Sequence, residues 1–206
     1  MLHATSETHP IRVDVVPTDH LPGRLGVTFA PGEKDAGGTS RVRWDRDLAT
    51  DLRDLRGRFG TDVLVPLVRG YEYELLGIAD LVPRAQEHGM RVRAFEIDDV
   101  SVPDPHFADR FRELIATLHG DLRDGRTVTV HCRGGLGRTG LVAACLLVRQ
   151  GAEPTRAIAR VREHRPGAIE TRAQERYVHD DAAWCDATAA RGPDSDLPRR
   201  LAQGPR

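Results

Sequence analysis

Residues 127–140 read Thr127-Val128-Thr129-Val130-His131-Cys132-Arg133-Gly134-Gly135-Leu136-Gly137-Arg138-Thr139-Gly140. The first four residues are β-branched, which is typical of a buried strand. Gly134, Gly135 and Gly137 then predict a tight loop. An apolar run from Leu141 to Val148 predicts a helix that follows the loop. A strand, a loop and a helix in direct succession indicate an α/β protein.

The rest of the chain alternates between strand patterns and helix patterns. Short apolar runs predict strands at residues 11–16, 25–29, 63–68 and 92–97. Apolar residues at helical spacing predict helices at residues 45–60, 75–88, 107–118, 154–164 and 172–184, with Asp45 as the N-cap of the first and a possible kink at Pro83 in the second. We therefore expect an α/β fold with a mostly parallel central sheet flanked by helices, whose ligands bind beyond the carboxyl ends of the strands.

The composition limits the possible functions. The chain has 206 residues, 39% of them hydrophobic, which suits one domain. We expect a flexible segment at residues 1–10, a single domain at residues 11–190 and a disordered tail at residues 191–206. Because 30 basic residues balance 31 acidic ones, no nucleic acid or membrane partner is expected. Three widely spaced cysteines and the lack of a long apolar run favour a cytoplasmic location.

The glycine loop has the features of an anion site. A strand, a glycine-rich loop and a helix N-terminus direct several main-chain N–H groups into one small space, which suits a phosphate or sulfate ion. We expect residues 133–139 to bind the substrate, and the planar fork of Arg138 to hold two phosphoryl oxygens. The same positive environment favours a thiolate at Cys132, which can attack phosphorus. Thr139 could donate to that sulfur, and His131 orders the junction between strand and loop.

A leaving alkoxide or phenolate needs a proton from a carboxylic acid outside the loop. Asp98, Asp99 and Asp104 all follow the predicted strand at residues 92–97. Neighbouring parallel strands end on the same side of a sheet, so this segment is expected to approach Cys132. Spacing alone does not choose among the three. The nine histidines show no metal-ligand spacing, so we expect no metal and no other cofactor.

A cysteine followed six positions later by an arginine and then a threonine, behind a strand, is the motif of the cysteine-based protein phosphatases. Beyond this motif, the chain from about Leu25 to Trp184 resembles the kinase-associated phosphatase family, also called the cyclin-dependent kinase inhibitor 3 family, which is of the dual-specificity type. The resemblance is carried by Leu25-Gly26, Pro31-Gly32, Arg69-Gly70, Ile97 to Asp104, Leu136 to Leu147, and Ala168-Ile169-Glu170-Thr171 with Gln174.

This resemblance implies a dual-specificity-phosphatase-like fold and assigns roles to individual residues. It makes Cys132 the nucleophile, Arg138 the phosphate-binding residue and Asp99 the general acid, with its neighbour Asp98 as the alternative. Gln174 is similar to a residue that places the hydrolytic water. The implied substrates are phosphorylated proteins carrying phosphotyrosine, phosphoserine or phosphothreonine.

Two other functions remain open at this point. The same loop serves phosphatases of inositol phosphates, phosphoinositides or other small phosphates, although such sites gather extra cations and only Arg133 is added here. A module that binds phosphoproteins without cleaving them is the third reading, but no residue needed for chemistry is missing from the sequence.

Overall fold

The computed structural model describes residues 2–34 and 42–191. Its main sheet has the strand order β2-β3-β7-β5-β6. The strands are β2 (Asp14–Val16), β3 (Arg24–Thr28), β5 (Val63–Pro66), β6 (Arg91–Val92) and β7 (Thr127–His131). β2 is antiparallel to β3, and every other pairing is parallel. The expected α/β fold with a mostly parallel central sheet is therefore confirmed.

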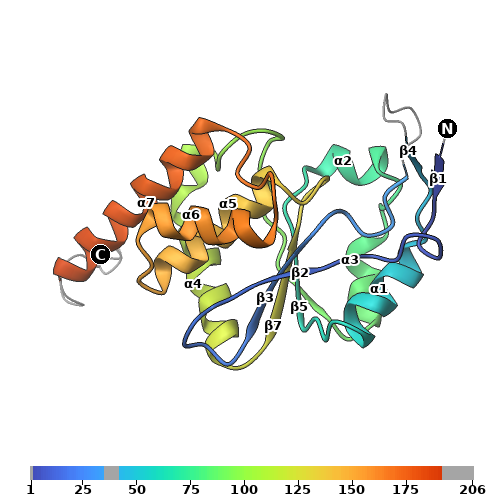
Figure 1. The fold of residues 1–206 in the computed structure, drawn as a ribbon, viewed down its shortest axis with the longest axis horizontal. Coiled ribbons are helices and arrows are strands. Elements are labelled where there is room, and N and C mark those ends of the chain that lie inside the picture. The colour runs from blue at the N-terminus through green and yellow to red at the C-terminus, as the bar shows by residue number, and fades with distance from the viewer. Residues whose placement is uncertain (1, 35–41, 192–206) are drawn as a thin grey trace, which may run out of the picture.

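Helices cover both faces of this sheet, with α4, α5, α6 and α7 on one side and α1 and α3 on the other (Figure 1). The helices are α1 (Leu48–Gly57), α2 (Gly70–Leu75), α3 (Leu81–Glu87), α4 (Ala108–Arg123), α5 (Gly137–Arg149), α6 (Pro154–His164) and α7 (Arg172–Arg191), with a 3₁₀ turn η1 (Pro105–Phe107) before α4. None of the helices within the described ranges is long and apolar enough to cross a membrane.

The sequence of β5 shows why helices pack on both faces. Val63 and Val65 belong to the core cluster under α4 and α5, whereas Leu64 belongs to the cluster that contains Leu52 and Leu81 of α1 and α3. Successive side chains of a strand point to opposite faces, so a continuous apolar run is buried on both sides. This is the pattern of a strand inside a covered parallel sheet.

Several predicted boundaries differ from the structure. The first helix begins at Leu48, because Asp47 and not Asp45 caps it by accepting a hydrogen bond from the Thr50 amide. The helix expected at residues 75–88 is wrong at its start: α3 begins only at Leu81, and Leu75 is the last residue of α2, which the sequence did not predict. A turn at Gly77, which has a φ of 66°, separates the two helices. Pro83 causes no kink because it lies in the first turn of α3, where no N–H is needed.

The N-terminal segment was expected to be flexible, whereas the structure gives it regular contacts. β1 (Leu2–Ala4) pairs in parallel with β4 (Val42–Trp44) to form a second, two-stranded sheet. Ala4 is buried, and the buried Ser6 hydroxyl accepts a hydrogen bond from the Asp47 amide at 2.9 Å. Residues of this segment therefore pack against the rest of the described chain. The tail expected at residues 191–206 lies, apart from its first residue, outside the described residues.

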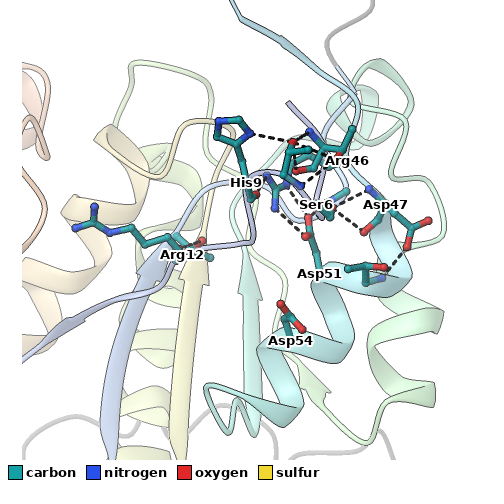
Figure 2. A network of polar contacts seen from close by, with 12 residues as sticks. Ser6, His9, Arg12, Arg46, Asp47, Asp51 and Asp54 are labelled. Carbon is teal, nitrogen blue, oxygen red and sulfur yellow. Dashed lines mark hydrogen bonds and ion pairs between the residues drawn. The ribbon is translucent and has the colours of Figure 1, made fainter. Parts of the chain in front are cut away.

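A buried ion pair ties this segment to the rest of the molecule, as Figure 2 shows. Arg46 and Asp51 are each 1% exposed and are joined by two hydrogen bonds of 2.8 Å. Arg46 also donates to the His9 carbonyl, and Asp51 accepts from the Gly32 amide at 2.8 Å. The pair thus fixes the N-terminal segment and the loop after β3 at the same time.

We predict that Asp51→Ala lowers the free energy of unfolding by about 3–5 kcal/mol, because it leaves the Arg46 charge buried without its partner. Asp54→Ala is the matched control on the same helix. Asp54 pairs with Arg58, which is 55% exposed, so its loss should cost less than about 1 kcal/mol. Urea denaturation measures both values, and equal losses would contradict the structural role of the buried pair.

Candidate active site

Cys132 lies at the carboxyl end of β7, where the central strand of the sheet enters the glycine loop. Cys132 is 3% exposed, and α5 begins five residues later at Gly137. The loop therefore turns from strand to helix around the thiol, as the sequence predicted. Amides at the start of α5 have no partners within the helix, and this arrangement favours an anion beside the sulfur.

Two of the loop glycines are required by close contacts. Gly135 has a φ of 69°, and a Cβ there would collide with the Thr28 carbonyl at the end of β3. A Cβ on Gly137 would collide with the side chains of Glu170 and Gln174. Gly134 has open space around it, so packing would allow a larger residue at this position. The loop is thus pressed between β3 and the segment before α7.

Other parts of the chain hold the loop in shape. The Arg133 carbonyl accepts a hydrogen bond from the Ala30 amide at 2.9 Å, and the Arg133 side chain pairs with Glu33 at 3.4 Å. The Leu136 carbonyl accepts from the Ile169 amide at 3.3 Å. Arg165 donates to the carbonyls of residues 134 and 135 at 2.9 and 3.1 Å. Sequence analysis missed Arg165, because nothing in its local sequence distinguishes it from a surface arginine of α6.

Arg138 is 1% exposed and makes two of its hydrogen bonds with one carboxylate. Its Nη1 and Nη2 donate to the two oxygens of Glu72 at 2.6 and 3.0 Å, and Nη1 also donates to the Ile97 carbonyl at 3.2 Å. Burial alone would lower the pKa of Arg138. The hydrogen bonds that Arg138 donates to Glu72 and the nearby charges of Cys132, Glu72 and Asp99 outweigh burial and raise that pKa. The guanidinium is therefore charged and fixed in orientation.

Glu72 is the main residue of the site that sequence analysis missed. It also accepts a hydrogen bond from the Arg69 amide at 2.8 Å, as an acidic residue in the first turn of a helix often does. Burial tends to raise the pKa of Glu72, but its hydrogen bonds with Arg138 and Arg69 lower it overall. A carboxylate three residues after Arg69 is a local signal for the start of a helix. The pairing of Glu72 with Arg138, 66 residues away, has no local signal in the sequence.

The three candidate acids lie in different surroundings. Asp99 is 53% exposed, and its Oδ1 lies 2.9 Å from Arg138 Nη2. Asp98 lies instead 3.4 Å from Arg69 Nη1. Asp104 caps η1, and the hydrogen bond from the His106 amide is the main cause that lowers its pKa. Of these three, only Asp99 is brought to Arg138.

Gln174 is fully buried beside the loop. Its Oε1 accepts from the Glu170 amide at 2.9 Å, and its Nε2 donates to the Ser101 carbonyl at 2.9 Å. Gln174 therefore joins the start of α7 to the segment that carries Asp99. The same amide group packs against Gly137, so it lies at the edge of the predicted anion site.

Three buried polar atoms around Cys132 have no hydrogen-bond partner among the described residues. They are Arg138 Nε, Thr139 Oγ1 and His131 Nε2. The first two lie on residues predicted to bind the anion, and uncompensated burial of such donors is costly. Thr139 and Arg138 thus remain available for a ligand of the loop.

His131 is fully buried, and its Nδ1 donates to the Cys132 carbonyl at 3.2 Å. Burial is the main cause that lowers the pKa of His131 to about 4. The imidazole is therefore neutral near pH 7, which suits a residue that orders the junction between strand and loop.

We predict that His131 makes folding sensitive to acid. The unfolded chain binds a proton at this histidine below about pH 6.5, whereas the folded protein does so only near pH 4. Stability is therefore lost as the pH falls from 6.5 to 4, by about 3 kcal/mol for this group. Denaturant titrations between pH 6.5 and 4 should show a smaller decrease in the free energy of unfolding for His131→Asn than for the wild type. His179→Asn alters an exposed residue and should show the same decrease as the wild type. An identical pH dependence of wild type and His131→Asn would refute this.

Comparisons with known proteins identify the family. A family model described as "Swiss Army Knife protein, DSP-PTPase phosphatase domain" matches residues 84–178. Cyclin-dependent kinase inhibitor 3 of Rattus norvegicus is 32% identical over 182 residues, which cover 86% of this chain and 81% of the relative. The Homo sapiens protein of that name is 33% identical over 159 residues, 76% of this chain and 70% of the relative.

A solved structure agrees with these relatives. The crystal structure of kinase associated phosphatase with its catalytic-site cysteine replaced by serine superposes with a TM-score of 0.75 and 26% identity, over 86% of this chain and 97% of that one. The chain therefore belongs to the cyclin-dependent kinase inhibitor 3, or kinase-associated phosphatase, family and is a cysteine-based protein phosphatase of the dual-specificity type.

Proposed function

We propose that Cys132 is the nucleophile, Arg138 the phosphate clamp and Asp99 the general acid and base. The Cys132 thiolate attacks phosphorus and forms an S–P bond, while the bond between phosphorus and the substrate oxygen breaks. Asp99 gives its proton to that oxygen, and the hydroxyl product leaves. Water then attacks the phosphocysteine, Asp99 takes the proton of the water, and the S–P bond breaks to release phosphate and regenerate the thiolate.

The contacts of Arg138 carry this proposal. A guanidinium has five N–H donors. Glu72 takes one donor from Nη1 and one from Nη2, the Ile97 carbonyl takes the second Nη1 donor, and Asp99 pairs with Nη2. Nε has no partner among the described groups. The edge formed by Nε and Nη2 is therefore the one that can hold two phosphoryl oxygens once Asp99 releases Nη2.

This arrangement explains how Asp99 performs two tasks. While the site holds no phosphoryl group, its carboxylate neutralises Nη2. When a phosphoryl dianion takes that donor, electrostatic repulsion drives the Asp99 carboxylate away from Nη2. A protonated Asp99 beside the loop is placed to donate to the leaving oxygen. Asp98, held by Arg69, has no such contact with the clamp.

The remaining loop residues complete the site. We propose that the amides of residues 133–139 bind the other phosphoryl oxygens, that a free phosphate or sulfate ion binds in the same place, and that Gln174 orients the hydrolytic water. The catalytic unit is a single domain at residues 11–190 and works without a cofactor. The substrates are proteins carrying phosphotyrosine, phosphoserine or phosphothreonine. The names of the relatives refer to cyclin-dependent kinases, and we propose no such partner for this chain.

The central prediction concerns the nucleophile and the acid. Cys132→Ser should abolish the hydrolysis of 4-nitrophenyl phosphate and of phosphopeptides. Asp99→Asn should lower kcat for a phosphoserine peptide by about 10²-fold or more, because an alkoxide needs the proton, and less for 4-nitrophenyl phosphate, whose leaving group is stable without it. Asp98→Asn is the matched control and should stay near wild type.

Initial rates over phosphoserine, phosphothreonine and phosphotyrosine peptides and inositol phosphates test the proposal. Retained activity in Cys132→Ser would exclude the phosphocysteine route. A larger decrease in kcat for Asp98→Asn than for Asp99→Asn would assign the general acid to Asp98. Faster turnover of inositol phosphates than of any phosphopeptide would move the substrate class to small phosphates.

Glu72 should matter through Arg138. Glu72→Gln removes the charge and one acceptor, so the guanidinium loses its fixed orientation, and we expect kcat/KM for 4-nitrophenyl phosphate to fall by about 10- to 100-fold. Glu74→Gln alters an exposed residue of the same helix and should leave kcat/KM unchanged. Thermal unfolding of both variants separates misfolding from misorientation, and a folded Glu72→Gln with wild-type kinetics would contradict the clamp geometry.

A further inference from the structure

A cavity of about 730 Å³ lies beside the segment that carries Asp99. One wall is formed by residues 94–98, which extend the chain beyond β6. The other wall is formed by residues 101–107 and Arg110. The proposed mechanism leaves this groove without a role.

The first wall is an open edge of the main sheet. β6 is the last strand in the order of the sheet, and hydrogen bonding to β5 continues past its end. The amides of Arg93, Phe95 and Ile97 donate to the carbonyls of residues 64, 66 and 67 at 3.0, 3.0 and 3.2 Å. Alternate residues of an extended chain direct their main-chain groups to opposite sides. The amides and carbonyls of Ala94 and Glu96 therefore point away from β5, and both residues line the groove.

These outward groups are unpaired. Within residues 2–34 and 42–191, no main-chain hydrogen bond is made by Ala94 or by Glu96. Exposed edges are often protected by charged side chains that repel an added strand. Here Glu96 and Asp98 lie 3.3 and 3.4 Å from Arg69, so their charges are neutralised on the α2 side. The edge is thus left accessible to another extended chain.

The opposite wall offers apolar surface and one cation. Phe107 is 46% exposed, and the Arg110 guanidinium lies 5.6 Å from the centre of its ring. Pro103 and Pro105 lie beside it in the same wall. Side chains of an extended segment alternate between two faces, so a segment paired with the edge would direct every second side chain toward this wall.

The groove is continuous with the phosphate clamp. The amide of Ile97 makes the last of these hydrogen bonds, to the Leu67 carbonyl, and the carbonyl oxygen of Ile97 accepts a hydrogen bond from Arg138 Nη1 at 3.2 Å. Asp99 follows two residues later and pairs with Nη2. An extended substrate chain advances about 3.3 Å per residue. Its residues one to three positions from the clamped phosphoresidue would therefore lie opposite Glu96 and Ala94.

We propose that an extended segment of the phosphoprotein substrate, next to its phosphorylated residue, pairs as an added strand with the main chain of residues 94–98. This inference rests on the proposed function, since it places a protein chain in the site. Main-chain pairing gives affinity with little dependence on sequence. The enzyme therefore prefers phosphoresidues in flexible, extended segments over small phosphates and over phosphoresidues inside helices.

A pair of substitutions at one residue tests the role of the main chain. Glu96→Pro removes the outward N–H, and proline is tolerated at an edge where that group makes no bond to the sheet. Glu96→Ala removes the same side chain and keeps the N–H. The measured quantity is kcat/KM for a nonapeptide with a central phosphotyrosine flanked by alanine and threonine, divided by kcat/KM for 4-nitrophenyl phosphate.

We expect this ratio to fall about five- to tenfold in Glu96→Pro, as the loss of one main-chain hydrogen bond would give. In Glu96→Ala, which keeps the N–H, it should change less than about twofold. Equal ratios in the two variants would overturn the proposal. A dimer of the wild type that Glu96→Pro dissociates in light scattering would assign the edge to self-association and overturn it as well. If the wild type hydrolyses neither compound, the proposed function itself fails, which is a distinct result.

N-methylation of the peptide gives a second test that needs no variant. Only every second amide of a paired strand faces its neighbour. Methylating the amides one at a time on each side of the phosphotyrosine should lower kcat/KM at alternate positions on one side only. A uniform effect, or none at any position, would show that the peptide does not bind as a strand.

Discussion

Arg138 carries a positive charge at a position that is 1% exposed, and such a charge is tolerated in a protein only when it is paired and hydrogen-bonded. Glu72 supplies the charge and two acceptors, and the Ile97 carbonyl supplies a third. The geometry of the site follows from this requirement. The short helix α2, the segment that ends at Ile97 and the first turn of α5 must all meet at the Arg138 guanidinium. They do so close to Cys132 at the end of β7.

The parallel sheet brings these segments together. β3, β5 and β7 end on the same side, with Thr28 and Pro66 both aligned to His131. The chain leaving each strand therefore contributes to one small region: the segment at residues 29–34 contacts Arg133, the segment after β5 delivers Glu72, and β7 delivers Cys132. The buried pair of Arg46 and Asp51 then fixes the first of these segments through Gly32.

The parts of this arrangement that could be predicted from sequence are those with a local cause. The strand and loop at residues 127–140 are visible because β-branched residues and glycines have preferences of their own. β1, with three residues, is too short for a recognisable pattern, and the break between α2 and α3 depends on one turn at Gly77. Glu72 and Arg165 could not be found, because their roles depend on partners distant in sequence that only the fold brings near.

The segment that carries Asp99 has both a strained residue and an anchor. Val100 is β-branched and has a φ of 58°, a conformation that costs about 1–3 kcal/mol. Gln174 holds the next residue, Ser101, through its carbonyl, and Ile97 is held on the other side by β5 and Arg138. Between these two fixed points, Asp98 is held by Arg69 and by a hydrogen bond from the Ser101 amide to its carbonyl, which leaves Asp99 and Val100 with the fewest contacts to the main chain. The ion pair with Arg138 offsets the strain at Val100. In the proposed mechanism, a phosphoryl group that takes Nη2 would remove this compensation and favour a different conformation of Asp99 and Val100. Phosphate binding by Arg138 and the position of Asp99 would in this proposed mechanism be coupled through one nitrogen atom, Arg138 Nη2.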